Sequence, residues 1–529
     1  MVHDFNAAGQ PAPLPHPEVP QMREIITELQ SLGVRMPDPS GGRSGGAGPA
    51  EGRALIIDGK AVNVPITAPY VADSPYHLTA EHDHFLLFKD GVPIAPVFTT
   101  PEPKFYRFFT DDNHCSRQVA LLHGRDCLAT TVLQRCVHWR HNQRCAFCGT
   151  EISLASQSTL PVKTPRQLST VARMAKTLDG VSHVVLTAGT GDPPGSELAY
   201  LADCARSIKA ASGLPVHVQF APPEDLGLMD AVKAAGVDTV GIHVESFDPE
   251  ILARLAPAKA AIGMDRYQAA WKKAVELFGP NQVSSFLIVG MGESAESVVW
   301  GSEILADLGV YPYVVPLRPI PGSAMAGAVP PPAETMKKIY TAVARILKRK
   351  GLRASQSRAG CVRCGACSAL HAYESPVSSL ICHSARTSGE QEACLAIRNE
   401  VFVREQRIFT GSDLDAHDDA ATLLVARRDG EAVGTVRIYP GELGNGHWIG
   451  GRLAVKKEFR DFRVGAMLVK EAMKRVKKRN CTLFTAHIQE KNVPFFQKIG
   501  WRPEGSLENH HGRPHQLMVA DLDRVPDDL

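Results

Sequence analysis

The hydrophobic positions in the middle of the chain follow a repeating pattern. Between residues 127 and 317, short apolar runs recur, and a segment long enough for a helix follows each of them, such as Pro165 to Leu178 and Asp265 to Leu277. The runs are Cys127 to Leu133, His183 to Thr187, Pro215 to Phe220, Thr239 to Val244, Val283 to Val289 and Tyr313 to Leu317. This alternation of strand and helix predicts parallel βα units, and hence an α/β fold with an open or closed barrel.

The parts that flank this region carry other patterns. Apolar residues at helical spacing predict a short helix over 20–33, and the Gly-, Pro- and Ser-rich stretch 37–52 predicts a flexible linker. β-type runs indicate a small β-rich region over 53–110. A basic helix over Tyr340 to Lys350 is followed by a Ser-, Gly- and Cys-rich stretch, Ser355 to Ser388, which is typical of a domain boundary.

The C-terminal part does not repeat the strand-and-helix alternation. It begins with a helical pattern, and its predicted elements are strands at Ala421 to Arg427, Glu431 to Tyr439, His447 to Val455 and Thr482 to Ile488, with helices at Val464 to Lys478 and Pro494 to Ile499. This mixture predicts an α+β domain. The expected organisation is a helix and linker (1–52), a β-rich region (53–110), a barrel (111–354), a Cys-rich tail (355–387) and the α+β domain (388–529).

Composition narrows the function classes. At 529 residues the chain is long enough for several domains, and its formal net charge of +2 argues against nucleic acid as a partner. We find no apolar stretch of about 18 residues that would cross a bilayer, and the N-terminal residues lack the pattern of a secretory signal. These observations predict a protein of the reducing cytoplasm, where twelve dilute cysteines indicate metal ligation rather than disulfides.

The first cysteine group follows the first barrel strand. Cys136, Cys145 and Cys148 form a C-x8-C-x2-C pattern at the strand end where barrels bind their ligands. Three thiolates can hold three corners of a [4Fe–4S] cluster, which usually takes four cysteines, so one iron would stay open. The alternative is a structural zinc site that His138 or His141 completes.

The segment resembles the radical S-adenosylmethionine (SAM) family, whose three-cysteine loop follows the first barrel strand and usually has an aromatic residue before its last cysteine. The resemblance recurs at Leu186 to Thr190, at Val244 to Asp248, and at Ile288 to Glu293, which matches the family's I-x-G-x-x-E. It implies a [4Fe–4S] cluster whose open iron binds SAM, radical hydrogen abstraction from a small-molecule substrate, and an electron donor such as flavodoxin or ferredoxin. The SAM contacts that it implies are Phe147, Thr187, Gly189, Thr190, Glu245, Ile288, Gly290 and Arg318.

The second cysteine group follows the last barrel helix. Cys361, Cys364 and Cys367 offer three more thiolates, and Cys382, His371 and His383 lie near enough in sequence to add a fourth ligand. Radical SAM proteins often hold an auxiliary iron–sulfur cluster on such cysteines, and a zinc knuckle or an exposed redox-labile loop are the alternatives. The remaining isolated cysteines, Cys115, Cys127, Cys204, Cys394 and Cys481, are interpreted as core or surface thiols.

A turn rich in arginine and glycine precedes the basic helix of the C-terminal part. Arg460, Gly465 and Ala466 match the R-x-x-G-x-G/A pyrophosphate loop of the GNAT acyl-CoA N-acyltransferases, with Arg463 in place of the first glycine. Nearly all of 386–529 resembles this family, including Ile397 to Gln406, Gly451 to Val455 and Asn492 to Trp501. The implied acetyl-CoA contacts are Leu453, Val455, Arg460, Arg463, Val464, Gly465, Ala466 and Asn492.

One position departs from the GNAT pattern. Many members have a tyrosine that protonates the leaving thiolate where this chain has Phe496, which cannot donate a proton. Either another group does so or the domain binds acyl-CoA without efficient transfer. Candidate bases are Glu400, Glu405, Asp415 and His487, and the sequence does not choose among them.

Both halves resemble proteins encoded near nitrilase-superfamily genes in bacterial nitrogen-scavenging clusters. The resemblance implies a bifunctional enzyme that combines radical SAM chemistry with acyl transfer in nitrile or cyanide nitrogen use. A second hypothesis makes the C-terminal domain a CoA-responsive regulatory or assembly module. A third places zinc in both cysteine groups and makes the chain a scaffold.

Overall fold

The computed structural model of the protein contains two compact units, which divide between Ser375 and Pro376 and are described separately. The structure describes residues 22–38, 52–57, 60–81, 84–141, 143–155, 157–374, 380–428, 431–442, 446–462 and 464–524. Most of the predicted linker and Arg463 therefore lie outside the described residues. No helix in these ranges is long and apolar enough to cross a membrane.

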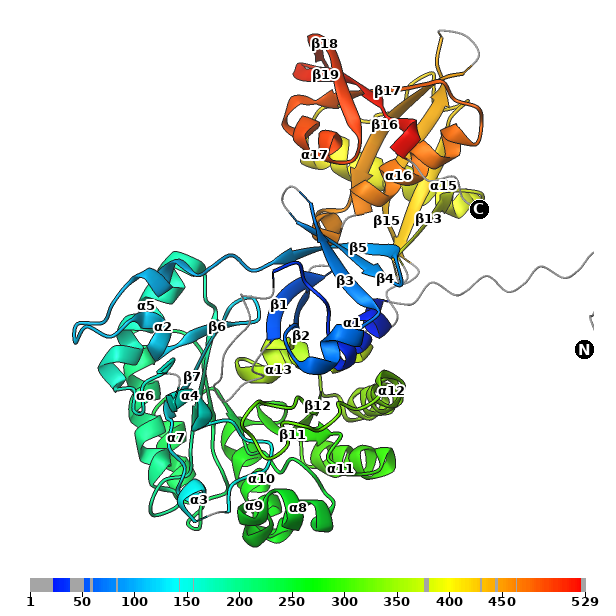
Figure 1. Cartoon of the computed structure of the whole chain (residues 1–529). Helices are drawn as coiled ribbons and strands as arrows, with labels where there is room; N and C mark the ends of the chain where they lie inside the picture. Colours follow the sequence, from blue (N-terminus) through cyan, green and yellow to red (C-terminus); the bar gives the residue numbers. More distant parts are fainter. Residues whose placement is uncertain are drawn as a thin grey trace, which may run out of the picture. The chain divides into compact units, whose positions relative to one another are not determined.

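A curled seven-stranded sheet forms the centre of the first unit (Figure 1), with the strand order β12-β11-β10-β9-β8-β7-β6. Its strands are β6 (Leu121–His123), β7 (Cys127–Leu133), β8 (His183–Ala188), β9 (Val216–Gln219), β10 (Thr239–Gly241), β11 (Val283–Val289) and β12 (Val310–Pro316). β7 to β12 are parallel and only β6 pairs antiparallel, with β7. The predicted α/β class and the partial six-stranded barrel are thus confirmed.

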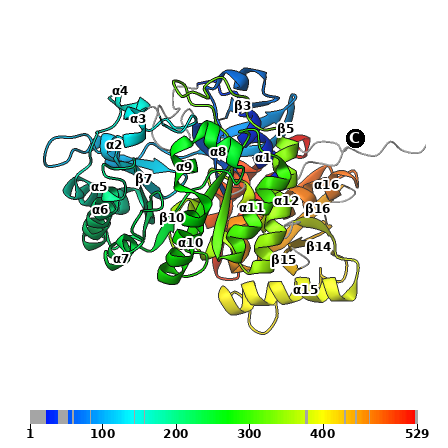
Figure 2. The same ribbon diagram turned by 90° about the horizontal axis from the view of Figure 1, so that it is seen from below.

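Helices between the strands cover the outer face of the curled sheet, as the view from below shows (Figure 2). The helices of this region are α5 (Pro165–Asp179), α6 (Ser196–Ser212), α7 (Leu228–Ala234), α8 (Pro249–Leu255), α9 (Pro257–Ile262), α10 (Met264–Phe278), α11 (Ala295–Asp307) and α12 (Ala333–Lys350). Of these, α9 lies toward the inside of the curled sheet. α5 begins with a capping box of Thr164 and Gln167, which satisfies backbone donors that the first turn leaves unpaired. Trp271 of α10 is fully buried and its Nε1 donates to the Ile242 carbonyl at 2.9 Å, which fixes this helix to the sheet.

A small antiparallel sheet and a helix form the N-terminal layer of the same unit. The sheet contains β1 (Gly52–Ile57), β2 (Lys60–Pro65), β3 (Tyr76–Ala80), β4 (Phe85–Lys89) and β5 (Val92–Thr99), in the order β2-β1-β5-β4-β3. The helix α1 (Met22–Leu32) joins the layer to α12, since Glu28 forms 2.7 Å ion pairs with Lys337 and Lys89. The amide of Gln30 and the backbone N–H of Asn63 both donate to the Ala366 carbonyl, at 3.0 and 2.7 Å. The layer therefore holds the loop that carries the second cysteine group.

Short helices complete the first unit: α2 (Ser116–Val119), α3 (Val137–Arg140), α4 (Ile152–Ala155), α13 (Gly360–Cys364) and α14 (Leu370–Glu374). The Cys-rich stretch is not a loose connection over its first half. Val362, Ala369 and Leu370 are buried in the same core as the barrel strands, and Gly360 donates its backbone N–H to His183 Nδ1 at 3.3 Å. Residues 360–370 are thus part of the first unit.

The second unit is built on one mixed sheet of the order β13-β14-β15-β16-β17-β19-β18. Its strands are β13 (Ile381–Ser384), β14 (Thr422–Arg428), β15 (Glu431–Pro440), β16 (His447–Val455), β17 (Leu483–Gln489), β18 (Trp501–His510) and β19 (Arg513–Ala520), and its helices are α15 (Ser388–Arg398), a π-helical turn (Asn399–Glu405), α16 (Val464–Lys477) and α17 (Val493–Lys498). Pairing between β16 and β17 is parallel and is limited to residues 447–449 of β16. Beyond Ile449 the two strands diverge and open a gap in the sheet.

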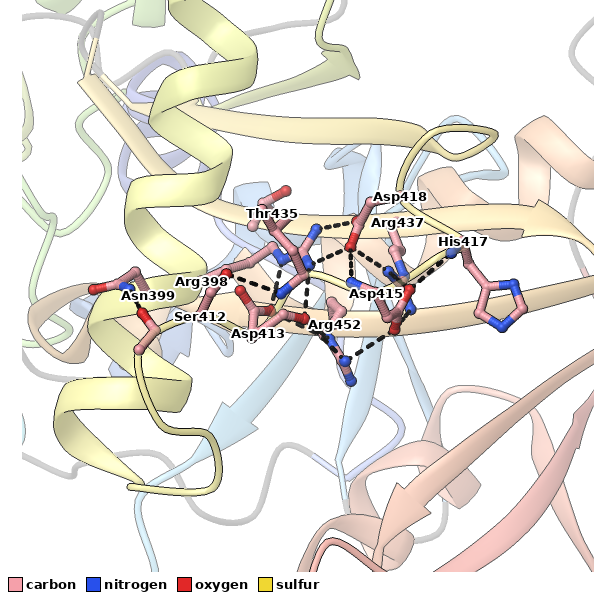
Figure 3. Close-up of polar contacts among 12 residues, drawn as sticks. Arg398, Asn399, Ser412, Asp413, Asp415, His417, Asp418, Thr435, Arg437 and Arg452 are labelled. Atoms are coloured by element: carbon pink, nitrogen blue, oxygen red, sulfur yellow. Dashed lines mark hydrogen bonds and ion pairs between the residues drawn. The ribbon is translucent and has the colours of Figure 1, made fainter.

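A network of six charged side chains joins α15, residues 413–418, β15 and β16 (Figure 3). Arg398 is fully buried and donates to Asp413 at 2.8 Å and to Asp418 at 2.6 Å. Arg437 pairs with Asp415 and Asp418, and Arg452 pairs with Asp413 and Asp415. Hydrogen bonds from these arginines lower the pKa of Asp415 and Asp418 despite their partial burial. Three arginines thus balance three carboxylates within the unit.

We predict that Arg398→Ala destabilises the second unit by about 3 to 5 kcal/mol, because it removes the fully buried one of the two arginines that pair with each of the carboxylates of Asp413 and Asp418. Lys456→Ala is the control, since its pair with the half-exposed Glu431 is worth about 1 kcal/mol or less. Chemical denaturation with separate probes for the two units measures both. Equal effects of the two substitutions would contradict the role given to Arg398.

Candidate functional site

One cavity of about 370 Å³ lies inside the curled sheet of the first unit, and both cysteine groups line it. Its walls come from the strand interiors and from the loops that follow the strands. The barrel therefore places Cys136, Cys145 and Cys148 on the wall of the same cavity as Cys361, Cys364 and Cys367. From the sequence alone, the two cysteine groups are interpreted as separate sites.

Backbone hydrogen bonds fix the loop of the first group. The N–H of Cys136 donates to Glu151 Oε1 at 2.9 Å, and the N–H of Ala146 donates to the Leu255 carbonyl at 2.7 Å. Burial raises the pKa of Cys145 to about 12 and also raises the pKa of Cys148. These thiols are protonated in the metal-free chain, so a bound metal centre must displace their protons.

Seven of the eight predicted SAM contacts line this cavity: Phe147, Thr187, Gly189, Thr190, Glu245, Ile288 and Arg318. A glycine is required at position 189 because the chain passes close to the backbone of Arg135. A Cβ there would lie 2.2 Å from the Arg135 carbonyl oxygen. Gly290 does not contribute to the cavity wall. Its backbone N–H donates to Glu293 Oε1 at 2.7 Å, so in this structure the Gly290 turn is held by the last residue of its own motif.

Sequence reasoning missed two polar residues of this cavity, His243 and Lys259. Lys259 Nζ pairs with Glu245 Oε1 at 2.8 Å and donates to the His243 carbonyl at 2.5 Å. Burial opposes its charge, but Glu245 outweighs burial and raises the pKa of Lys259. His243 stacks on Phe286 with ring centroids 4.1 Å apart. A lysine 14 residues from its carboxylate carries no local signal in the sequence.

Three buried polar atoms on the cavity wall have no hydrogen-bond partner among the described residues: Glu245 Oε2, His243 Nε2 and Arg318 Nη1. Buried polar atoms are normally paired, so these atoms are suited to a polar ligand. Together with three thiols on the wall, they fit an iron–sulfur cluster and a charged cofactor such as SAM.

The spread of the thiols also bears on the zinc alternative. A tetrahedral zinc with Zn–S bonds of about 2.3 Å needs sulfurs about 3.8 Å apart. Among the described residues, three potential ligand atoms within 4.8 Å of one another occur at His487, Glu508 and His510, and not at either cysteine group. His138 lines the cavity, whereas His141 is exposed. In each cysteine group, the three sulfur atoms therefore do not all lie within 4.8 Å of one another.

The second cysteine group has neighbours that the sequence did not predict. His123 Nδ1 lies 3.4 Å from Cys364 Sγ and His123 Nε2 lies 3.3 Å from Cys367 Sγ. Cys127 is buried near Cys364, and this proximity raises the pKa of the Cys127 thiol and lowers that of Cys364. Burial opposes charge on His123, but the charges of Cys367 and Cys364 raise its pKa to about 10.

The predicted sources of a fourth ligand divide between the two units. His371 belongs to the first unit, and its Nδ1 is hydrogen-bonded to the Ser368 carbonyl at 2.8 Å. Cys382 and His383 belong to β13 of the second unit. Cys127, which the sequence treats as an isolated thiol, is instead the further cysteine that contacts the group.

The second unit has its own cavity of about 150 Å³ where β16 and β17 diverge. Gly450, Gly451 and Leu453 of β16 line one side, and Ala486 to Gln489 of β17 line the other. The Trp501 indole nitrogen and the Gln489 side-chain oxygen are buried there without partners in the described structure. The gap leaves backbone groups and two polar side chains for an elongated polar ligand such as the pantetheine arm of acetyl-CoA.

The predicted CoA contacts are only partly assembled in this cavity. Leu453 and Asn492 line it. Val464, Gly465 and Ala466 form the first turn of α16, where unpaired backbone N–H groups can receive a phosphate. Arg460 is held by Glu405 through two bonds of 2.7 and 2.6 Å and donates to the Val455 carbonyl. A pyrophosphate would have to compete with Glu405 for this arginine.

The four candidate bases differ in their surroundings. Glu405 pairs with Arg460, Asp415 belongs to the arginine network, and Glu400 is exposed. His487 lines the cavity of the second unit, with Glu508 Oε2 3.9 Å from its Nδ1 and with the ring of His510 4.4 Å away. Burial and the neighbouring His510 lower its pKa, so His487 is neutral at pH 7 and able to accept a proton.

Comparison with known proteins identifies the two parts. Residues 142–299 match the Radical SAM superfamily, and residues 390–501 match the Acetyltransferase (GNAT) family. The bacteriochlorophyllide c C-7(1)-hydroxylase of Chlorobaculum limnaeum is 27% identical over 173 residues, which are 30% of this chain and 42% of that protein. The chain thus spans less than half the length of that relative.

Relatives of the C-terminal part are matched over most of their length. A Bacillus subtilis (strain 168) protein classed as an acetyltransferase is 30% identical over 135 residues, which are 24% of this chain and 86% of that protein. Solved structures of Escherichia coli ElaA and of a Pseudomonas aeruginosa acyl-CoA N-acyltransferase each have a TM-score of 0.25; they are 21% and 23% identical, and the matches cover 27% of this chain and 99% and 100% of those chains. The chain therefore carries a radical SAM domain, and its C-terminal domain belongs to the GNAT acetyltransferase family.

Proposed function

We propose that the protein is a bifunctional enzyme in which the barrel abstracts hydrogen from a small substrate and the C-terminal domain transfers an acyl group from acetyl-CoA to an amine. The observation that carries the first half is the set of three thiols, Cys136, Cys145 and Cys148, on the wall of the cavity inside the barrel. The substrate of each half and the nitrile or cyanide pathway are parts of this proposal, and the latter is supported by the sequence resemblance alone.

In the barrel, Cys136, Cys145 and Cys148 would hold a [4Fe–4S] cluster, and its open iron would take SAM. When bound and given one electron by a donor such as flavodoxin or ferredoxin, these groups would supply a 5′-deoxyadenosyl radical. The chain orients the cofactor with the backbone at Gly189, where the absence of a side chain lets two segments of the chain approach closely. The unpartnered Arg318 Nη1 and Glu245 Oε2 offer the cofactor polar contacts. Lys259 holds Glu245 in place through its ion pair. The buried cavity excludes water from a reactive radical.

We predict that Cys145→Ala lowers the yield of 5′-deoxyadenosine from SAM and dithionite by more than about 100-fold, the upper end of what loss of an outer-shell metal partner costs. The substitution removes one of three cluster ligands. Anaerobically reconstituted wild type and Cys115→Ala, which loses a thiol bonded to the Tyr106 carbonyl, should both retain cleavage. A colourless wild type that leaves SAM intact would contradict the radical assignment.

In the C-terminal domain, we propose that His487 removes a proton from the attacking amine, directly or through a water. It is placed on the wall of the cavity where the diverging strands would admit the thioester. Glu508, whose Oε2 lies 3.9 Å from His487 Nδ1, would stabilise the charged form of His487 after proton transfer. The chain offers no hydroxyl at Phe496, which is 5% exposed and packs edge to face on Trp501 at 5.5 Å.

We predict that kcat/KM for acetyl transfer stays level from pH 8 down through pH 7 and falls only below the usual histidine range. The base must be neutral to act, and its pKa is lowered, so activity is lost as pH drops through that lowered pKa. His487→Ala should lower kcat/KM about 100-fold and abolish this acid limb. His417→Ala, on an exposed histidine that stacks on Tyr439, should change neither.

Phe496 also supports a second candidate, a CoA-binding regulatory or assembly module. This alternative predicts that CoA binds in calorimetry while acetyl-CoA is not consumed over a panel of primary amines. Turnover with any of these amines excludes it.

A further inference from the structure

The second cysteine group lies at the opposite end of the barrel strands from the first. Gly360 contacts His183 and His217, and Cys364 contacts Cys127; His183, His217 and Cys127 stand at or near the start of β8, β9 and β7. Cys136, in contrast, follows the end of β7. Both groups nevertheless line the same cavity.

A tight hairpin brings two further ligand-type residues to this end of the barrel. β6 and β7 pair antiparallel with His123 opposite Cys127, and the turn between them begins at Gly124. A Cβ on Gly124 would lie 2.7 Å from Cys364 Sγ, so the turn is shaped to admit this sulfur. The hairpin thus presents an imidazole and a thiol to the loop that holds Cys361, Cys364 and Cys367.

We propose that Cys127, Cys361, Cys364 and Cys367 are the four ligands of a second iron–sulfur cluster, and that His123 hydrogen-bonds to its cysteine sulfurs. Four cysteines are the usual ligand set of such a cluster. This inference rests on the proposed function and extends it. The sequence alone assigns only three thiols, Cys361, Cys364 and Cys367, to the second centre, and the fold adds Cys127. A cluster with four thiolates has no vacant iron, so it cannot anchor a substrate in the cavity by direct coordination.

The surroundings of the four sulfurs match this assignment. The Gln219 amide donates to Cys361 at 3.4 Å, and the Asn63 amide lies 3.9 Å from Cys367. His123 lies 3.4 and 3.3 Å from Cys364 and Cys367, and whichever ring nitrogen carries the proton, it donates to a sulfur. Such bonds orient the ligands of a metal centre and tune its reduction potential.

The first cluster can be removed to expose the second. In the full-length variant with Cys136, Cys145 and Cys148 all changed to Ala, we expect about four iron atoms per chain and the visible absorption of a cluster after anaerobic reconstitution, against about eight in wild type. Adding Cys127→Ala should abolish the remaining iron. Adding Cys204→Ala, which removes an equally buried thiol from α6, should leave it unchanged.

A measurement without a change at Cys127 covers the case in which that variant fails to fold. The reduced triple variant should give an EPR spectrum that added cyanide does not alter, because a four-cysteine cluster has no open iron. His123→Leu in the triple variant should retain iron and lower the midpoint potential in an EPR redox titration, since a donor to the sulfurs is lost.

Several results would overturn the assignment. These are one zinc and no iron in the triple variant, no bound metal at all, a cyanide-sensitive spectrum, or full iron retention after Cys127→Ala. Failure of the proposed radical chemistry would be seen separately. In that case the variant with Cys361, Cys364 and Cys367 changed to Ala would hold no iron. The variant with Cys136, Cys145 and Cys148 changed to Ala would still hold the second cluster.

Discussion

The architecture of the first unit depends on one constraint: thiols from two separate loops must be buried around a common cavity. Burial disfavours their ionised form, and the pKa of Cys145 rises to about 12 for this reason. Such groups are stable as protonated apolar side chains or as metal ligands, and the loops around them are arranged for ligands. The barrel supplies one set from the ends of its strands, and the N-terminal sheet and α1 hold the loop that supplies the other.

In the second unit, the corresponding constraint is the gap between two strands of its sheet, which must stay open. Its central strands separate after residue 449, and the exposed backbone would favour closure of the sheet. Arg452 adopts a φ of 53°, which is unfavourable for a residue with a side chain, beside a shift in register between β15 and β16. Its bonds to Asp413 and its position over the Phe409 ring, 4.5 Å from the centroid, stabilise this conformation. The charged network thus supports the bulge that keeps the cavity available.

The elements that the sequence predicted are those with a periodic apolar signal. Strands of a parallel sheet are buried on both faces and form continuous apolar runs, so β7 and β11 were predicted at their observed bounds. β18 was missed because most of its residues are exposed and carry no alternation. The cysteine loops were recognisable from local spacing. His123 and Cys127 were not, because their partners are more than 230 residues away and only the fold brings them together.

That separation has a consequence for how the chain is made. His123 precedes its partner Cys364 by 241 positions. At a synthesis rate of about 5 to 20 residues per second, the hairpin leaves the ribosome roughly 10 to 50 s before the loop that it contacts. During that interval Cys127 has neither its neighbour nor its final burial, and it must stay reduced in a nascent polypeptide. Contacts this distant in sequence also form slowly. This end of the barrel therefore cannot assemble before residues 361–367 have been synthesised.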